Sequence, residues 1–523
     1  MTTNQAAVAN GNRAVRPNTG RPNTGRAGTG QVGTGQAGTG QAGTGQAGTG
    51  QAGYPRRWLA AIVMIVGALM DMIDVTIVNV ALPSIRRDLN ASATQLEWVV
   101  SGYMLAFAAA LIIAGNLGDK FGRKRLFLSG AALFGLASLA AGMSGSGAEL
   151  IAARVVQGAA AAAMAPQVLA TFRVIFAREE RGKAFGIYGA MLGFASAIGL
   201  VLGGVLTEAN LFGWEWRSVF YVNVPVAVAA LIAGVRFVPE TRDPAAGRPN
   251  LPGAVLLAGS LVAIVYPLLE GRQLGWPAGV WPLMAAGVAG LVGLGLFEAR
   301  QSRREVQRFA PLLRAGLFRI PAFAAGMGVQ LAFFAGMQGF FIAFALWLQA
   351  GEHFSPLKAG LTAVAFSVGS FFAAPVAVPL AQRHGRRILA GGAVLMVAGI
   401  AGVALAAPHV GLNGSPWPVV PGLVVAGAGL ALLVIPLVNV VLAAVPAEVA
   451  GGASGLFSTA QQLGGALGVA LLGTVFFGYL GGHSFEAALV HTAPYAMGAF
   501  ALCAVLSLLL PRTAVSEEAL TES

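Results

Sequence analysis

Charged residues and cysteine are both scarce in this sequence. Asp, Glu, Lys and Arg make up 10% of its 523 residues, whereas about 25% is usual in soluble globular domains. The single cysteine, Cys503, excludes an intramolecular disulfide and a cysteine-based metal site. The five histidines lie in loops or near the ends of apolar runs and show no zinc spacing, so we predict no metal site.

Nucleotide-binding motifs are also missing. The sequence contains no GxxxxGK[ST] loop, which excludes a nucleotide-driven primary pump, and no cofactor is expected. A net charge of +12 would favour a nucleic-acid partner only if the basic residues formed one soluble face, but they are spread among short loops. We therefore expect no nucleic-acid partner. Hydrophobic residues make up 56% of the chain, and their long runs indicate a polytopic membrane protein embedded in the lipid bilayer.

The first 54 residues differ in kind from the rest. Residues 16–50 form seven Gly-rich pentads that end in three copies of QAGTG, and such a segment cannot bury enough apolar surface to fold. We predict a disordered low-complexity tail; a partner-binding array is the alternative. No secretory signal is predicted, because the first apolar run is long and begins far from the N-terminus.

Fourteen apolar spans separated by short polar breaks follow the tail, and they predict an all-α protein with fourteen transmembrane helices. Lys and Arg accumulate in cytoplasmic loops, so they test this count. With both termini in the cytoplasm, only five of the 33 Lys and Arg lie in external loops, which favours a multi-pass protein of the plasma membrane. The expected spans are 58–83, 96–117, 126–146, 149–172, 182–207, 218–238, 250–270, 279–299, 321–350, 357–381, 387–407, 417–443, 455–480 and 492–511.

Internal repetition divides the spans into related halves. The loop GNLGDKFGRKR (115–125) has a degraded copy, PLAQRHGRR (379–387), and the fifth and thirteenth spans both begin with Gly-rich segments at nearly the same offset. Spans 1–6 and 9–14 are therefore predicted to be parallel repeats, with spans 7 and 8 inserted between them. The predicted parts are the tail 1–54, an N-terminal bundle 55–240, the inserted pair 241–305, a C-terminal bundle 306–511 and a short tail 512–523.

Two carboxylates, Asp71 and Asp74, lie near the middle of the first span. An ionisable group at that depth costs about 3 kcal/mol or more, so it usually faces a partner or a cavity. Arg154 is the basic residue that lies well inside a span, and we expect it to pair with Asp74. Asp71 lies one turn closer to the cytoplasm, so we expect it to recognise positive charge on a substrate. The alternative is an acid pair buried for packing alone.

Several segments carry motifs that can be compared with known families. They are 74–83 (DVTIVNVALP), 115–125 (GNLGDKFGRKR), 154–158 (RVVQG), 214–225 (WEWRSVFYVNVP), 355–360 (SPLKAG) and 461–473 (QQLGGALGVALLG). With these motifs, residues 55–511 resemble the major facilitator superfamily, and specifically its fourteen-span drug:proton antiporter branch. The resemblance implies a major facilitator fold of two six-helix bundles plus an inserted helix pair.

The resemblance also implies roles for particular residues. Arg154 would act in proton coupling together with Asp74 and Asp71. In the 115–125 loop, a conformational latch is implied; the alternative is a loop that merely orients the helices through its basic residues. The latch residues are Gly115, Asp119, Gly122, Arg123 and Lys124.

The fifth span departs from the branch pattern. It reads GLVLGG, with Leu200 where the antiporter motif has proline. Gly199, Gly203 and Gly204 still permit close approach of another helix, so we retain a hinge or seal here. With Leu200 at this position, exchange and another mode of coupling are both open alternatives.

A substrate cavity is expected along the ninth span, where four residues share one helix face, although packing is the alternative. The expected lining residues are Asp71, Gln157, Gln330, Phe334, Gln338 and Phe341. The function predicted is a monomeric, proton-coupled secondary transporter that exports amphipathic or hydrophobic compounds by alternating access. Export or flipping of an endogenous lipid or secondary metabolite is one alternative, and a non-transporting membrane sensor or scaffold is another. We predict no catalytic residues and no enzyme activity, because two acids and one arginine supply an intramembrane catalytic site poorly.

Overall fold

The computed structural model describes residues 54–242, 250–271, 273–301, 315–445 and 450–510, and within them the regular structure is helical throughout. Apart from Tyr54, the two predicted tails lie outside these ranges. The helices are α1 (Arg57–Leu89), α2 (Ala93–Phe121), α3 (Arg123–Met143), α4 (Gly147–Ile175), α5 (Arg178–Ala209), α6 (Ser218–Tyr221), α7 (Asn223–Phe237), α8 (Leu251–Glu270), α9 (Val280–Gln301), α10 (Pro321–Leu346), α11 (Pro356–His384), α12 (Arg386–Ala406), α13 (Val420–Ala443), α14 (Ala450–Leu480) and α15 (Phe485–Ser507).

Each predicted span coincides with helical structure, but not every helix is long and apolar enough to count as a membrane crossing. Among the described residues, 12 helices are long and apolar enough to cross a bilayer, and up to 13 if the two parts of α2, bent by 49°, form one span. The sixth span is the combination of α6 and α7, and the fifth is α5. Because the apolar part of α5 is only the short segment Ile198–Ala209, fourteen crossings stay a prediction.

Polar residues at the ends of the apolar runs define where several helices begin. Ser92 and Gln95 form a capping box at the start of α2, in which each side chain accepts a hydrogen bond from the other residue's backbone N–H. Ser146, Ser355 and Ser484 cap α4, α11 and α15 in the same way with their hydroxyl oxygens. These caps satisfy backbone N–H groups at helix ends that the chain would otherwise leave unpaired.

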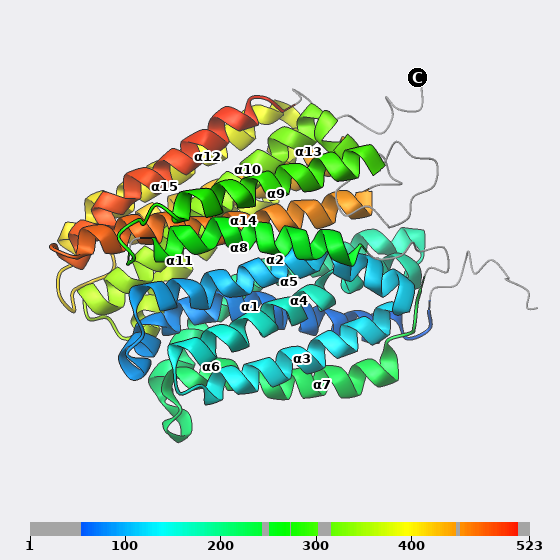
Figure 1. Ribbon diagram of the computed structural model, residues 1–523, viewed down its shortest axis with the longest axis horizontal. Helices are drawn as coiled ribbons and strands as arrows, with labels where there is room; N and C mark the ends of the chain where they lie inside the picture. The colour runs from blue at the N-terminus through cyan, green and yellow to red at the C-terminus, as the bar shows by residue number, and fades with distance from the viewer. Residues whose placement is uncertain (1–53, 243–249, 272, 302–314, 446–449, 511–523) are drawn as a thin grey trace, which may run out of the picture. The chain divides into compact units, whose positions relative to one another are not determined.

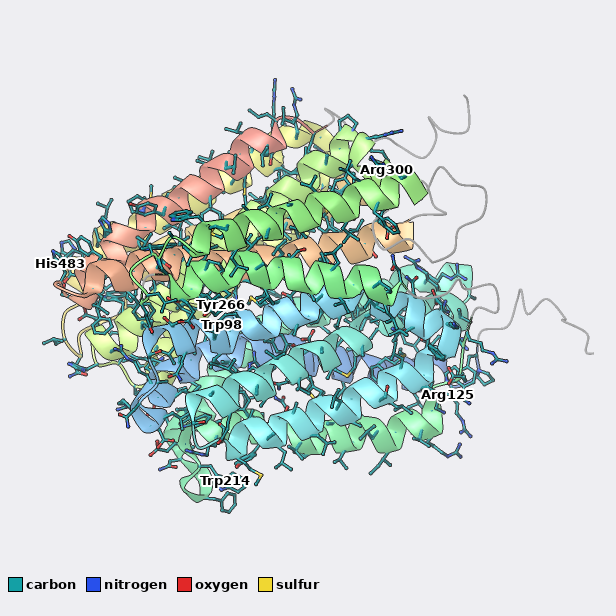
Figure 2. All side chains as sticks on the ribbon, in the orientation of Figure 1. Trp98, Arg125, Trp214, Tyr266, Arg300 and His483 are labelled. Carbon is teal, nitrogen blue, oxygen red and sulfur yellow. The ribbon has the colours of Figure 1, made fainter. Side chains whose placement is uncertain are left out.

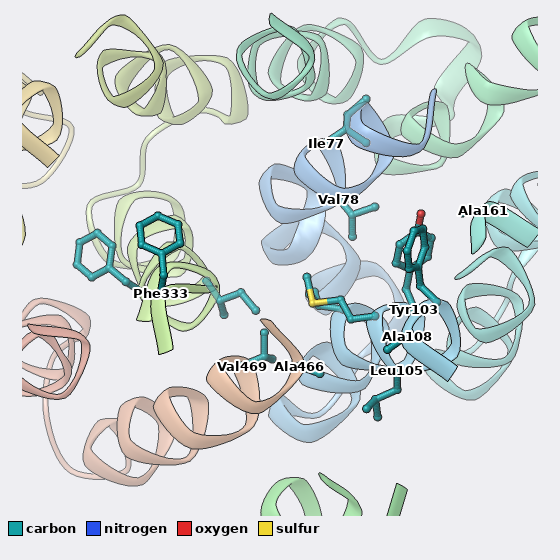
Figure 3. Packing of buried hydrophobic residues seen from close by; sticks show 14 of the residues in the cluster. Ile77, Val78, Tyr103, Leu105, Ala108, Ala161, Phe333, Ala466 and Val469 are labelled. Carbon is teal, nitrogen blue, oxygen red and sulfur yellow. The ribbon is translucent and has the colours of Figure 1, made fainter. Parts of the chain in front are cut away.

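The helices associate as two related halves with an added pair. Helices α1–α7 pack mainly on one another, and α10–α15 do the same. The halves meet where α2 packs on α14 and α5 packs on α11, while α8 lies against both α2 and α14 and carries α9 (Figure 1). Buried apolar side chains of α1, α2, α10 and α14 fill the region between the halves (Figure 3). The residue boundaries of the two bundles stay a prediction.

The two halves make the same kind of contact at the end of the helices where α3 and α12 begin. Lys124, at the start of α3, donates to the carbonyl of Val235 near the end of α7 at 2.8 Å. Arg386, at the start of α12, donates to the carbonyl of Leu508 just beyond α15. In both halves a basic residue of the repeated loop therefore binds the carbonyl end of the last helix, where the helix dipole favours a cation.

Loops with basic residues gather at one end of the helices. Figure 2 shows Arg125 and Arg300 at this end, and Trp214 and His483 at the opposite end. We call the end with Arg125 the inner end and the end where α1 finishes, at Leu89, the outer end. Near the inner end, Arg57 of α1 pairs with Glu180 at the start of α5 at 2.7 Å, and this guanidinium lowers the pKa of the Glu180 carboxyl.

Candidate functional site

A buried ion pair lies at the centre of the N-terminal half. Asp74 is 0% exposed, and its Oδ2 accepts a hydrogen bond from Arg154, which is 1% exposed. The structure thus places together the two charges that the sequence analysis pairs. A buried charge without a partner would cost several kcal/mol, so each of these groups requires the other.

Two amides complete the surroundings of the Asp74 carboxylate. Gln157 of α4 and Asn223 of α7 both donate to Oδ1, at 2.8 and 2.9 Å. Gln157 also donates to the hydroxyl of Ser138 on α3 at 2.9 Å and accepts from Arg154 at 2.6 Å. Two helices, α4 and α7, therefore hold this single carboxylate of α1 through three hydrogen bonds.

Arg154 has further partners beyond the carboxylate. Its Nε donates to the carbonyl of Val99 on α2 at 3.1 Å. Its guanidinium lies over the ring of Tyr103, 4.2 Å from the ring centroid. The close contact between α4 and α2 is possible because residue 158 is glycine, since a Cβ there would collide with the Tyr103 carbonyl. The close packing of α4 on α2 therefore directs the Arg154 side chain past α2 to Asp74 on α1.

Tyr103 joins the second acid to this site. Its hydroxyl donates to Asp71 Oδ1, and Asp71 is 3% exposed. The same aromatic ring stacks on Arg154, so Tyr103 contacts both the acid one turn below Asp74 and the arginine that binds Asp74. Asp71 is therefore part of the buried network in this conformation, and its carboxylate is already bound within the N-terminal half.

Gln157, which was predicted to line the substrate cavity, lies inside the polar site in this conformation. It is 0% exposed and is bound to Asp74, Arg154 and Ser138. The reason is helix geometry, because a residue three positions after Arg154 lies on the same face of α4 and follows it into the polar site.

The other predicted cavity residues lie on α10, in the C-terminal half. Gln330 and Gln338 are 2% and 8% exposed, and Gln330 donates to Gln461 of α14 at 3.4 Å. Phe334 and Phe341 are half-buried. The structure does not bring these four residues to Asp71, which lies in the other half.

A small cavity lies between the two halves beside Phe341. It is bounded by residues of α1, α5, α10 and α11 and of the short helical segment Trp347–Gly351 that follows α10, among them Asn79, Leu200, Phe344 and Gln349. Its volume is about 20 Å³, which is room for roughly one water molecule. In this conformation the seam between the halves is therefore closed at this level.

The loop predicted as a latch is held by contacts within the N-terminal half. Arg123 binds Asp119 at 2.7 Å and reaches the carbonyl of Ala170 on α4 at 3.4 Å. Gly122 has φ 110°, a backbone conformation that favours glycine, and it allows the abrupt change of direction from α2 to α3. Lys124 binds the end of α7, whereas Gly115 has open space where a side chain would be.

The glycines of the fifth span lie against two different helices. A Cβ on Gly199 or Gly203 would collide with α1, and one on Gly204 would collide with Leu357 at the start of α11. Conversely, Gly360 of α11 packs against the carbonyl of Leu200. Leu200 thus occupies the proline position of the motif without preventing close contact between α5 and α11.

Three residues of the polar site were missed by sequence reasoning: Tyr103, Ser138 and Asn223. Ser138 and Tyr103 lie in apolar spans without a distinguishing pattern. Asn223 belongs to the quoted segment 214–225, where an amide in an otherwise apolar helix start was an available signal. Among the described residues, no group of three or more His, Cys, Asp or Glu could hold a metal ion.

The two related halves of apolar helices have the architecture of a polytopic membrane transporter. The chain belongs to the Major Facilitator Superfamily, whose model matches residues 64–468 and 327–523. It is 40% identical to the probable actinorhodin transporter of Streptomyces coelicolor over 82% of this chain and 74% of that protein. It is 38% identical to the puromycin resistance protein pur8 of Streptomyces alboniger over 89% of this chain and 93% of that protein.

Solved structures share the fold at low sequence identity. A bacterial homologue of the human drug peptide transporters PepT1 and PepT2 aligns with a TM-score of 0.61 at 14% identity, over 86% of this chain and 97% of that chain. This likeness shows the major facilitator fold alone.

Proposed function

We propose that this protein is a proton-coupled exporter of amphipathic or hydrophobic compounds that works by alternating access. The observation that carries the proposal is the buried Asp74–Arg154 pair, which a structural role alone explains poorly because it is joined to a second buried acid. The names of its relatives, a probable actinorhodin transporter and a puromycin resistance protein, support export of drug-like molecules. No cofactor enters this proposal, since the proton gradient supplies the driving force.

Asp74 is the proposed proton-exchange group. When ionised, it holds Arg154 and draws α4 towards α1. A proton arriving on the carboxylate removes its charge, weakens the contact with Arg154 and leaves that cation to its remaining partners on α2 and α4. Proton uptake would thereby alter the packing of α1 against α4, which is the step we couple to movement of the two halves.

The C-terminal half supplies the proposed substrate surface. Gln330, Phe334, Gln338 and Phe341 of α10 combine amide dipoles with aromatic rings, a composition suited to amphipathic compounds. Among the described residues, the amide oxygen of Gln330 and the amide nitrogen of Gln338 are buried and have no hydrogen-bond partner. A substrate hydroxyl or carbonyl reaching α10 would satisfy them.

We propose that the protein lies in the plasma membrane with both termini in the cytoplasm. We also propose that it acts as a monomer. Export of an endogenous secondary metabolite is a second candidate, because the actinorhodin relative is named for transport of one compound and the chain matches it over most of its length. A non-transporting sensor is the alternative of another class.

The test is proton-driven ethidium transport by the full chain in liposomes. An imposed proton gradient should drive ethidium movement, and Asp74→Asn should reduce it to the level of protein-free liposomes, because the amide cannot carry a proton. Asp88→Asn is the matched control, since Asp88 lies on the same helix but pairs with Arg217 at the outer end. Full proton-driven transport by Asp74→Asn would refute the coupling proposal. Absence of flux for ethidium and for a panel of neutral drugs would favour the sensor.

A further inference from the structure

Asn223 differs from the other two hydrogen-bond donors to Asp74 because it lies on a different helix. Its amide nitrogen lies 2.9 Å from Asp74 Oδ1, and the residue is 3% exposed. It opens α7, a helix that packs on α1 and α3. Arg154 and Gln157, the other two donors, both belong to α4.

This difference of origin matters for proton exchange. Gln157 is bound to Arg154 as well as to Asp74, so a displacement of α4 would disturb both donors at once. Asn223 is carried by a separate helix and would keep its contact with Asp74. It is also neutral, so it favours the ionised carboxylate by hydrogen bonding without adding a second cation to the site.

We propose that Asn223 is a positioning residue for proton exchange, which holds the ionised Asp74 carboxylate in place and sets the pH at which Asp74 takes up a proton. This inference rests on the proposed proton coupling through Asp74. It assigns a role to an amide of the segment 214–225 that lies far from Asp74 in the sequence.

The charged and titratable groups that face the acids come from four helices. They are Asp71 on α1, beside Asp74, Tyr103 on α2, Arg154 on α4 and Tyr188 on α5, which faces Asp71. A substitution at position 223 leaves all four in place. A changed pH dependence in a variant with an uncharged residue at position 223 therefore reports the lost amide contact.

The experiment measures proton-driven ethidium transport by the full chain in liposomes as a function of pH. Asn223→Leu removes the donor to the ionised carboxylate at similar size, so the midpoint of the pH dependence of transport should shift upwards by about one pH unit. Asn223→Asp keeps the shape but places a second acid beside Asp74, and it should shift the midpoint further in the same direction. Asn79→Leu is the control, because Asn79 lies on α1 at the small cavity and should leave the midpoint unchanged.

The outcomes separate this inference from the proposed function. Unchanged midpoints in both Asn223 variants, with coupling still lost in Asp74→Asn, would overturn the role of Asn223 and leave the proposed function standing. If Asp74→Asn transports with full proton coupling, the proposed function itself fails. Should Asn223→Leu not yield a monodisperse protein, Asn223→Ala decides the question, because it removes the donor without adding a charge.

Discussion

Asp71 and Asp74 are three residues apart on α1, yet their partners come from different helices. Asp74 is bound by α4 and α7, whereas Asp71 is bound by Tyr103 of α2. Because the Tyr103 ring also stacks on Arg154, a change at either acid reaches the same arginine. The two acids therefore belong to one hydrogen-bonded network. A substitution at Asp71 is then expected to affect Asp74 as well, although the sequence predicts separate roles for them.

Asp71→Asn tests whether the two acids act together. Because Asp71 is 3% exposed and bound to Tyr103, we expect the variant to impair transport of ethidium, a cation, and of chloramphenicol, a neutral compound, by similar factors. Initial rates for the two compounds in liposomes measure this. A loss confined to ethidium would instead support the division in which Asp71 recognises positive charge.

The sequence predicts the Asp74–Arg154 ion pair, but it does not predict most of the residues that surround the pair. Asp74 and Arg154 are conspicuous because charge is costly inside an apolar span, and a buried cation needs a buried anion. Ser138 carries no such cost and lies in an apolar span without a distinguishing pattern, and the amide of Asn223 was a signal that did not by itself identify Asp74 as its partner. Their roles depend on how α3 and α7 pack around α1 and α4, which a single sequence does not specify.

Among the elements, the α2–α3 connection shows how a short motif fixes the angle between two helices. Gly118 lies so close to Gln167 of α4 that a side chain there would collide with it, and Gly122 supplies the positive φ of the turn. Asp119 then binds Arg123 one turn further on, across the break between the helices. The sequence predicts the motif, its glycines and its basic residues. It does not predict that the Asp119 carboxylate binds Arg123 of the same loop in this conformation.

Asp119→Ala tests the latch. The Arg123 guanidinium would lose its carboxylate partner, so the connection should move more freely and the balance between conformations should shift. We expect the maximal transport rate to fall several-fold with little change in the apparent KM for ethidium, since the loop lies away from α10. Lys120→Ala is the control, because Lys120 is an exposed residue of the same turn. Wild-type turnover in Asp119→Ala would count against a latch.

For the whole molecule, the contacts between the halves at the outer end are the feature that alternating access must break. Gln349 donates to the carbonyl of Val80 at 2.9 Å, three residues before Pro83 of α1. Glu208, near the end of α5, accepts from the backbone N–H of Leu357 at 3.1 Å, in the first turn of α11. A carboxylate at a helix N-terminus is favourable, yet this pair is exposed and therefore weak enough to open in each cycle.

A reversible cross-link between Glu208→Cys and Leu357→Cys should therefore hold the outer end closed. The chain suits this test because its single native cysteine, Cys503, is buried and should not react. Joining the two introduced cysteines with a short bis-thiosulfonate reagent should stop ethidium transport, and reduction should restore it, because the block is mechanical and not a loss of folding. Each single-cysteine variant, treated in the same way, should retain transport. If the cross-linked protein transports at the uncross-linked rate, the contact between α5 and α11 stays closed throughout the cycle, and the two halves must part along another seam.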